Sequence, residues 1–382
     1  MKQKSSSWNL AKHQRDWYSK WHTWAGITAG FVLIVVSLTG ALLVFEAELD
    51  EWLYSELYDF EKTGNKLSYQ EVTERVKNDY PELDLGGIFL RKETDVYTFF
   101  SKKKPFYQII ANPYTGNVTG KRVYKKTVMG FIRNLHRTLL IPGIGRYIVG
   151  ISSLVCVVLI VTGLKLWIPD KWNKLKRKLT LKWSSNKKRF NYDFHYILGT
   201  YFSSFITIIA ATGVMITFSS IVLIFMFLLN LQSPKSLKSI FNQKSVYIEG
   251  KKPISIDSLV AIVEREIPET YVTGVRFPKD SLGTYTVNTL SPYSTETGDV
   301  SFIFVDQYSG KIIFNSHKKE LQLGKLYLNW VTPFHYGTFG GLPTRIIALI
   351  SALATATLFI TGLIIWIPRM RKRNKKKKNI TY

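Results

Sequence analysis

The stretch from Ala25 to Phe45 reads AGITAGFVLIVVSLTGALLVF and contains no charged residue. Three later stretches have the same apolar character, at residues 147–168, 197–218 and 346–367. Each is about 20 residues long, which at about 1.5 Å per residue matches a hydrocarbon core of about 30 Å. Lys165 is the one Lys or Arg inside them, and it lies near an end, where its side chain can reach the headgroups. The four stretches therefore predict four transmembrane helices.

Basic residues beside these stretches predict how the chain crosses the membrane. The formal net charge is +25, and the densest basic runs, residues 171–189 and 369–378, each adjoin a membrane stretch. Lys and Arg in such places mark the cytoplasmic side, so topology explains the charge better than binding of nucleic acid does. Both ends of the chain are expected in the cytoplasm of a bacterium, and the two long intervening segments in its periplasm. The first stretch is too long for a cleaved signal peptide and lacks a small-residue cleavage site, which indicates a signal anchor in the inner membrane.

This topology divides the chain into alternating membrane and soluble segments. The third membrane stretch continues in apolar sequence to Leu231, so its helix is expected to project beyond the bilayer. The expected boundaries are 1–20 for a cytoplasmic N-terminal segment, 21–46 for the first membrane helix, 47–143 for the first periplasmic domain, 144–168 for the second helix, 169–193 for a basic cytoplasmic loop, 194–231 for the third helix with its extension, 232–343 for the second periplasmic domain, 344–368 for the fourth helix and 369–382 for a basic cytoplasmic tail.

The membrane stretches form an internal repeat, in which the first corresponds to the third and the second to the fourth. The first and third each have a His, a Gly four residues later and a Thr-Gly pair 17 and 18 residues later. The second and fourth are each preceded by a His, with an Arg 10 residues later and a Thr-Gly pair 26 and 27 residues later. The first copy has His22, Gly26, Thr39-Gly40, His136, Arg146 and Thr162-Gly163, and the second has His195, Gly199, Thr212-Gly213, His335, Arg345 and Thr361-Gly362. Matching spacings predict a tandem duplication, each copy having two membrane helices around one extracytoplasmic domain.

The two extracytoplasmic segments repeat as well. Ser68-Tyr-Gln-Glu71 is a capping-box pattern that predicts the start of a helix, and Ser255 opens the corresponding helix of the second copy. Two strand-like runs follow each helix, and the second run ends in a turn with glycine. These features are residues 96–100, 106–111 and 112–116 (Asn-Pro-Tyr-Thr-Gly) in the first copy and residues 284–288, 300–305 and 306–310 (Asp-Gln-Tyr-Ser-Gly) in the second. Each segment is therefore predicted to be an α+β domain with one helix packed on a small antiparallel sheet.

Four of the six histidines lie near the ends of the membrane stretches, where ionisable side chains are candidates for function. Because each copy has an even number of spans, both copies enter the membrane in the same direction, and a pseudo-twofold axis along the membrane normal is expected. Equivalent histidines then lie at one depth, His22 with His195 and His136 with His335. Two imidazoles that face each other across an axis can occupy the two axial positions of a haem iron. The pairs therefore predict two haems, while a headgroup contact or a helix cap is the alternative interpretation of each His taken singly.

Small and basic residues near the histidines have more than one interpretation. In the first and third membrane stretches, one glycine lies one helical turn after the His and a second lies five turns after it on the same helix face. Small residues at these positions either leave room for a porphyrin or allow close helix packing. These glycines are Gly26, Gly199, Gly40 and Gly213. Arg146 and Arg345 stand at the outer helix ends, where a guanidinium can pair with a haem propionate, reach the headgroups or bind lipid phosphate.

Other classes of chemistry have little support in the sequence. Cys156 is the single cysteine and lies in the second membrane stretch, so an intrachain disulfide is impossible and redox chemistry needs a cofactor. The sequence has no phosphate-binding loop, dinucleotide fingerprint or Ser-His-Asp arrangement. His13 and His317 lie away from the helix ends and are expected to be surface residues.

Taken together, these motifs resemble the PepSY-associated transmembrane family over nearly the whole chain. The resemblance rests on their order and doubling, namely His22 with Gly26, Leu135-His136 followed by Thr162-Gly163 and Trp167-Ile-Pro169, Phe334-His335 followed by Thr361-Gly362 and Trp366-Ile-Pro368, and the turns that end at Gly116 and Gly310. It implies two PepSY-like domains and similarity to inner-membrane ferric-siderophore reductases, which bind two haems through helix-edge histidines. His22, His195, His136 and His335 would then be the axial ligands of two b-type haems. Electrons would pass outward to Fe(III) in the periplasm, and Fe(II) would be released for iron uptake.

Two other functions compete with this interpretation. The chain could be a regulator or binding protein whose PepSY-like domains engage an extracytoplasmic peptidase or peptide, with structural histidines. A transporter of the siderophore or its iron is less favoured, because four short spans show no broken-helix site. For a reductase, the electron donor is expected on the cytoplasmic side or in the quinol pool, since the sequence has no flavin or nicotinamide motif.

Overall fold

The computed structural model describes residues 10–91, 95–169, 172–183, 185–230, 242–268, 270–290, 301–316 and 322–378. The chain forms two compact units. We call Met1–Val44, Leu135–Thr217 and Arg345–Tyr382 the membrane unit, and Phe45–Asn134 and Phe218–Thr344 the sheet unit. His317 and the side chain of His13 lie outside the described residues, so the expectation that they are surface residues stays a prediction.

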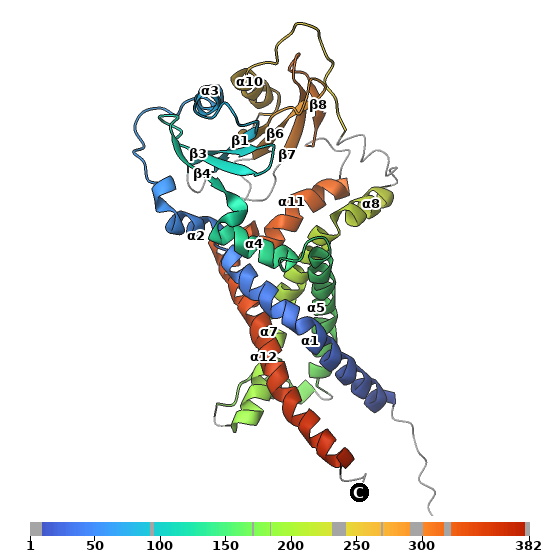
Figure 1. Cartoon of the computed structure of the whole chain (residues 1–382). Coiled ribbons are helices and arrows are strands. Elements are labelled where there is room, and N and C mark those ends of the chain that lie inside the picture. Colours follow the sequence, from blue (N-terminus) through green and yellow to red (C-terminus); the bar gives the residue numbers. More distant parts are fainter. Residues whose placement is uncertain are drawn as a thin grey trace, which may run out of the picture. The chain divides into compact units, whose positions relative to one another are not determined.

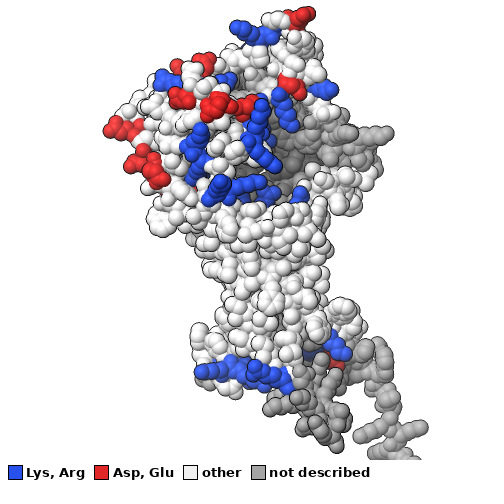
Figure 2. Space-filling view, viewed as in Figure 1, with Lys and Arg blue, Asp and Glu red and all other residues white. Residues whose placement is uncertain are grey.

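The membrane unit is built on four long helices (Figure 1). They are α1 (Leu10–Leu43), α5 (Gly145–Trp167), α7 (Lys187–Thr217) and α12 (Leu342–Lys378). Each contains a span long and apolar enough to cross a membrane, and the spans run over Gln14–Leu43, Gly145–Trp167, Lys187–Thr217 and Leu342–Arg371. Figure 2 shows a band without charged side chains along these helices. The predicted set of four candidate membrane helices is therefore confirmed for the part of the chain that the structure describes.

Small side chains line the contacts between these helices. Ala29, Cys156, Ala210 and Ala354, one from each helix, are buried in a single cluster. In a bilayer, lipid tails are as apolar as the helices, so close approach of helix backbones rather than exclusion of water drives their association. Large apolar residues such as Phe31 face outward, with 62% of the side chain exposed in the isolated chain.

The sheet unit contains one eight-stranded antiparallel sheet of order β4-β3-β2-β1-β5-β6-β7-β8. The first half contributes β1 (Leu85–Arg91), β2 (Val96–Ser101), β3 (Tyr107–Ala111) and β4 (Val118–Val123), and the second contributes β5 (Tyr271–Arg276), β6 (Thr284–Leu290), β7 (Ser301–Asp306) and β8 (Ile312–Asn315). One helix from each half, α3 (Tyr69–Asp79) and α10 (Ile256–Glu266), covers the same face of the sheet (Figure 1). Each half thus has the predicted composition of one helix and a small antiparallel sheet.

The two halves join between β1 and β5, which the sequence did not indicate. These strands pair antiparallel, with Gly87 opposite Arg276 and Phe89 opposite Gly274. Gly274 is needed here, because a Cβ at this position would lie 2.2 Å from the ring of Phe89. Buried side chains of both halves, including Val76 and Val263, belong to one hydrophobic core. The segments expected as separate domains therefore fold as one unit.

Local patterns in the sheet unit match their predictions. Ser68 caps α3, and its hydroxyl accepts from the Glu71 amide at 3.2 Å while the Glu71 carboxylate accepts from the Ser68 amide at 2.9 Å, so the capping box is confirmed. Gly116 and Gly310 have φ of 72° and 74°, the left-handed region that glycine reaches without steric cost. Both predicted turns are therefore confirmed. The predicted strand-like runs correspond to β2, β3, β6 and β7, whereas β1, β4, β5 and β8 were not predicted. The polar strand β4 and the glycine-containing start of β1 show no clear alternation.

The expected extension of the third membrane helix is a separate helix. α7 ends at Thr217 and is followed by α8 (Ser219–Leu229), so the expected continuous helix over 194–231 is interrupted. In the first half, α1 ends at Leu43 and is followed by α2 (Glu46–Leu53). Two further helices, α4 (Val128–Thr138) and α11 (Gln322–Tyr336), precede α5 and α12 in the chain. The remaining short helices are η1 (Ser55–Leu57), η2 (Tyr124–Lys126), η3 (Trp172–Lys174), α6 (Leu175–Leu179) and η5 (Thr338–Gly340).

Candidate cofactor site

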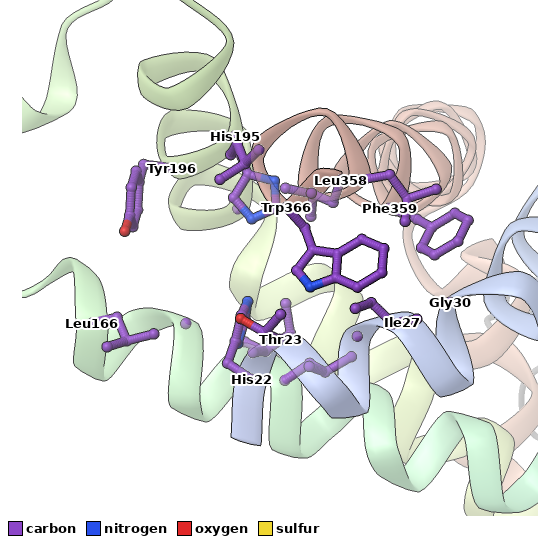
Figure 3. A pocket seen from close by; sticks show the side chains of 18 of the residues that line it. His22, Thr23, Ile27, Gly30, Leu166, His195, Tyr196, Leu358, Phe359 and Trp366 are labelled. Carbon is purple, nitrogen blue, oxygen red and sulfur yellow. The ribbon is translucent and has the colours of Figure 1, made fainter. Parts of the chain in front are cut away.

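The membrane unit brings together two of the four predicted histidines. The imidazole of His22 on α1 and that of His195 on α7 have ring centroids 6.5 Å apart and planes at 90°. Figure 3 shows them on facing sides of one pocket, with the indole of Trp366 beside them. Residues separated by 173 positions in sequence thus lie next to each other in the structure.

The pocket that holds this pair is a mainly apolar cavity of about 390 Å³. All four membrane helices contribute to its wall. Its apolar lining includes Ile27, Leu33, Leu159, Ile160, Leu358 and Phe359. A cavity of this size, with a few convergent polar groups in an apolar wall, is typical of binding sites for small molecules and cofactors.

Hydrogen bonds determine which nitrogen of each imidazole carries the proton. His22 Nδ1 lies 2.9 Å from the hydroxyl of Thr162, and that hydroxyl donates to the carbonyl of Val158 at 2.8 Å. When the single hydroxyl proton is directed to that carbonyl, the hydroxyl accepts from His22, an arrangement that favours the tautomer with the proton on Nδ1 and a lone pair on Nε2. A neutral imidazole with a bare Nε2 and a bonded Nδ1–H is the form that binds metal ions.

His195 repeats this arrangement. Its Nδ1 lies 2.8 Å from the hydroxyl of Thr361, which donates to the carbonyl of Thr357 at 2.8 Å. The same reasoning therefore leaves a lone pair on Nε2 of His195. The two histidines of the pair share one tautomer, and both are suited to coordinate a metal.

The glycine after each of these threonines leaves space for the imidazole. A Cβ on Gly163 would lie 3.2 Å from Cε1 of His22, and a Cβ on Gly362 would lie 3.5 Å from Cε1 of His195. We call each such pair a Thr-Gly seat, in which the hydroxyl binds Nδ1 and the glycine accommodates the ring edge. The sequence showed these pairs as part of the repeat, but no role was assigned to them. Their constant spacing in both copies was the available signal.

His136 occupies a third Thr-Gly seat. It lies on α4, its Nδ1 donates to the carbonyl of Val36 at 2.9 Å, and it is 3.2 Å from the hydroxyl of Thr39. A carbonyl oxygen only accepts, so the proton is again on Nδ1. A Cβ on Gly40 would lie 3.0 Å from Cε1 of His136, so Gly40 faces this histidine. Thr39 is 17 residues after His22 on α1, which places this seat about 25 Å from His22 along the helix axis.

His335 lies on α11 in the sheet unit. Its predicted pairing with His136 joins residues of the two units and stays a prediction. Gly213 lies on α7, next to Thr212, and its predicted role likewise stays open.

The remaining predicted glycines line the cavity of His22 and His195. A Cβ on Gly26 would lie 3.7 Å from Cδ2 of Leu159, and one on Gly199 would lie 3.5 Å from Cδ2 of Leu358. These are ordinary van der Waals distances. Both interpretations of these glycines, room for a porphyrin and close packing, are compatible with this placement.

The two predicted arginines, Arg146 and Arg345, donate hydrogen bonds to backbone carbonyls at helix ends. Arg345 Nη2 donates to the carbonyl of Val44 at 2.8 Å, just after α1 ends, and Arg146 donates to the carbonyl of Thr217, where α7 ends. Such bonds satisfy carbonyl groups that have no partner within the helix. Neither arginine belongs to the described lining of the cavity around His22 and His195. Their contacts connect the first helix of each copy with the second helix of the other, in agreement with a pseudo-twofold arrangement.

The His22 and His195 pair fits the axial ligands of one haem. The 6.5 Å between their ring centroids leaves room for a metal ion that both imidazoles would hold. The bare Nε2 atoms and the apolar wall suit the same group.

Comparison with known families gives one match. The model of the PepSY-associated TM region matches residues 19–369, which include all four membrane spans for most of their length and the whole sheet unit. A search of curated proteins finds no match.

Proposed function

The chain belongs to the PepSY-associated TM family, and on this premise we propose that it binds haem through paired histidines and passes electrons across the bacterial inner membrane to ferric iron. The substrate would be a ferric siderophore or another ferric chelate in the periplasm. The observation that carries this proposal is the His22 and His195 pair. Their ring centroids are 6.5 Å apart in an apolar cavity, and the bonds of both Nδ1 atoms to threonine hydroxyls favour unprotonated Nε2 atoms.

The residues of the chain have distinct roles in this function. His22 and His195 would hold the iron of one haem, and the sequence predicts that His136 and His335 hold a second. Thr162 and Thr361 hold the first two imidazoles in the tautomer that binds metal. The apolar wall of the cavity excludes water. A haem held there would supply the one-electron redox chemistry that the side chains lack.

The electron balance determines what the donor must supply. Each Fe(III) takes up one electron and becomes Fe(II), which a chelator built for the harder Fe(III) holds weakly. A quinol supplies two electrons and releases two protons as it becomes a quinone, so it reduces two ferric chelates. A soluble reductase or a small cytoplasmic reductant would supply the same electrons from the inner side.

An absorption spectrum of the purified protein tests the proposal. Protein from iron-replete cells is expected to show a reducible bis-imidazole haem spectrum with two haems per chain. His22→Ala and His136→Ala are each expected to lose one haem and keep the other, while His317→Ala keeps both. A colourless and folded protein would contradict the proposal and favour the regulator that binds a peptidase or peptide.

Direction is tested in lipid vesicles. Vesicles that contain the protein and an internal reductant, with a ferric chelate outside, are expected to form external Fe(II) faster than vesicles without protein. His22→Ala is the matched control, because it keeps the membrane helices and lacks one ligand. Equal rates in all three preparations would contradict transmembrane electron transfer.

A further inference from the structure

The cavity around His22 and His195 has two basic residues in its wall. Lys20 precedes His22 by two residues on α1, and Arg369 follows Gly362 by seven residues on α12. Both lie at the helix ends predicted to face the cytoplasm. The guanidinium of Arg369 is 5.8 Å from the ring centroid of Tyr192, whose hydroxyl is 2.9 Å from that of Tyr196. The cavity wall is therefore mainly apolar and includes two cationic side chains.

This charge breaks the symmetry that the rest of the site obeys. The repeat places Asp193 where the first copy has Lys20, and Asp170 where the second copy has Arg369. Asp193 pairs with Arg189 at 3.4 Å and is not part of the described cavity lining. Asp170 lies outside the described residues. The histidines and their Thr-Gly seats therefore occur in both copies of the repeat. Each basic residue at the cavity occurs in one copy, and the corresponding position of the other copy is an aspartate.

We propose that Lys20 and Arg369 bind the two carboxylate arms of the haem in this cavity and so determine which way round it inserts. This inference rests on the proposed function. A carboxylate at the edge of an apolar cavity needs a cationic or hydrogen-bonding partner, and ammonium and guanidinium groups supply charge-assisted hydrogen bonds. The paired imidazoles do not distinguish the two orientations, whereas the two cations would. Arg146 and Arg345, which the sequence suggested for this contact, hold helix ends instead.

The test compares haem with its dimethyl ester, which has the same ring and iron and no acidic arms. Apoprotein carrying His136→Ala, so that one site titrates, is reconstituted with each compound, and binding is followed by the bis-imidazole absorption spectrum. We expect this protein to bind haem at least about tenfold more tightly than the ester. Adding Lys20→Gln and Arg369→Gln together is expected to remove most of this preference while the ester binds as before.

Two further variants make the result specific. Lys165→Gln with Arg371→Gln removes two cations from α5 and α12 that are not part of the described cavity lining, and the preference for haem is expected to stay. Lys20→Arg with Arg369→Lys retains both charges and is expected to retain the preference, which also covers the case in which the Gln variant fails to fold.

The outcomes separate this inference from the proposed function. If neither compound gives a bis-imidazole spectrum with the His136→Ala protein, the proposed function fails. If both bind but the preference for haem is unchanged by Lys20→Gln and Arg369→Gln, haem binding stands and the assignment of the two cations is overturned. Equal binding of haem and ester by the unsubstituted cavity would overturn it as well.

Discussion

The membrane unit and the sheet unit use buried polar groups in different ways. In the membrane unit, the imidazoles of His22 and His195 bind neutral threonine hydroxyls through Nδ1 and direct their other nitrogen toward a cavity. In the sheet unit, the Asp50 carboxylate is 1% exposed and is bound by the Tyr58 hydroxyl at 2.6 Å and by Arg122 Nη2 at 2.5 Å. Polar groups in the first unit keep a coordination position available, whereas those in the second bind each other.

Ionisation follows the same division. Burial, and then the hydrogen bond to Asp50, raises the pKa of Tyr58 to about 12, so this phenol stays protonated and donates to the carboxylate. A second cluster in the sheet unit joins Glu46 to Arg133 and Tyr124. Networks in which charged and polar side chains bind each other stabilise a fold, whereas an imidazole pair that lines a cavity is what a cofactor site requires. Substitutions in the two units should therefore separate stability from cofactor binding.

The largest effect is expected from Arg122→Met in the sheet unit. The substitution removes the closest cation of the buried Asp50 carboxylate. The remaining cation, Arg91, is farther away, at 3.7 Å from Asp50 Oδ2. Removing one partner of a buried ion pair costs about 3–5 kcal/mol. The free energy of unfolding should fall by about this amount in denaturant titrations, and the haem spectrum of the folded protein should not change. Adding Asp50→Leu should restore most of the stability, and a loss below about 1 kcal/mol for Arg122→Met alone would contradict the assignment of this pair as structural.

Thr162→Val should have the next largest effect, this time on cofactor binding. The valine keeps the shape of the side chain and removes the acceptor for Nδ1 of His22. Loss of such a partner of a metal ligand typically costs about 10–100-fold in affinity. Haem titration should show this loss, and Thr162→Ser should retain wild-type affinity. Thr28→Val is the matched control, since the Thr28 hydroxyl bonds only to carbonyls of its own helix in the described structure. A similar loss of haem affinity in Thr28→Val would contradict the proposed role of Thr162 as the partner of His22.

A smaller effect is expected from Gly163→Ala. The added methyl would lie 3.2 Å from Cε1 of His22, so the imidazole must shift by a few tenths of an ångström. We expect haem affinity to fall by up to about tenfold, with a shifted reduction potential. Gly26→Ala places its methyl at an ordinary 3.7 Å from Leu159 and serves as the comparison. If the two substitutions had equal effects, the glycine of the seat would have no special role.

The smallest effect concerns the pH dependence of the sheet unit. Burial of Asp306 opposes its ionisation, but the amides of Ser309, Val246 and Tyr308 donate to the carboxylate, and the net result is a pKa below the usual value. Its contribution to stability is therefore complete above the unfolded pKa of about 3.9 and is lost as pH falls through the lower folded pKa. The difference in unfolding temperature between wild type and Asp306→Asn should be constant from pH 7 to about pH 5 and decrease below about pH 4. A constant difference down to pH 3 would exclude this contribution.

Local patterns explain why much of the fold was predictable. A run such as Ala25–Phe45 specifies a membrane helix through its own length and apolarity, and Ser68 with Glu71 specifies a helix start through bonds three residues apart. The joining of β1 and β5 was not predictable in this way, because it depends on Phe89 lying against Gly274, which is 185 residues away in sequence.

The candidate site likewise contains residues that the repeat predicted and residues that only contacts between helices reveal. The repeat identified the four histidines and predicted that His22 would meet His195, since duplicated elements with an even number of spans are related by an axis along the membrane normal. It did not identify Thr162 and Thr361 as partners of those rings, because each threonine lies on a different helix from its histidine. The sequence also left several possible roles for Arg146 and Arg345, namely binding of a haem propionate, a headgroup or a lipid phosphate. In the structure both arginines donate hydrogen bonds to carbonyl groups at helix ends.

The sequence alone determined the four apolar spans, the matching spacings of the repeat, the capped helices and turns of the sheet unit, and which histidines lie near the ends of the apolar stretches. These properties depend on neighbouring residues and on exact spacing, both of which are written in the chain. The tertiary structure alone decided the 6.5 Å separation of two imidazoles, the tautomer of each ring, and the position of Lys20 and Arg369 at one cavity. These depend on how helices far apart in sequence pack, and packing fixes distances to a precision that composition and periodicity do not contain.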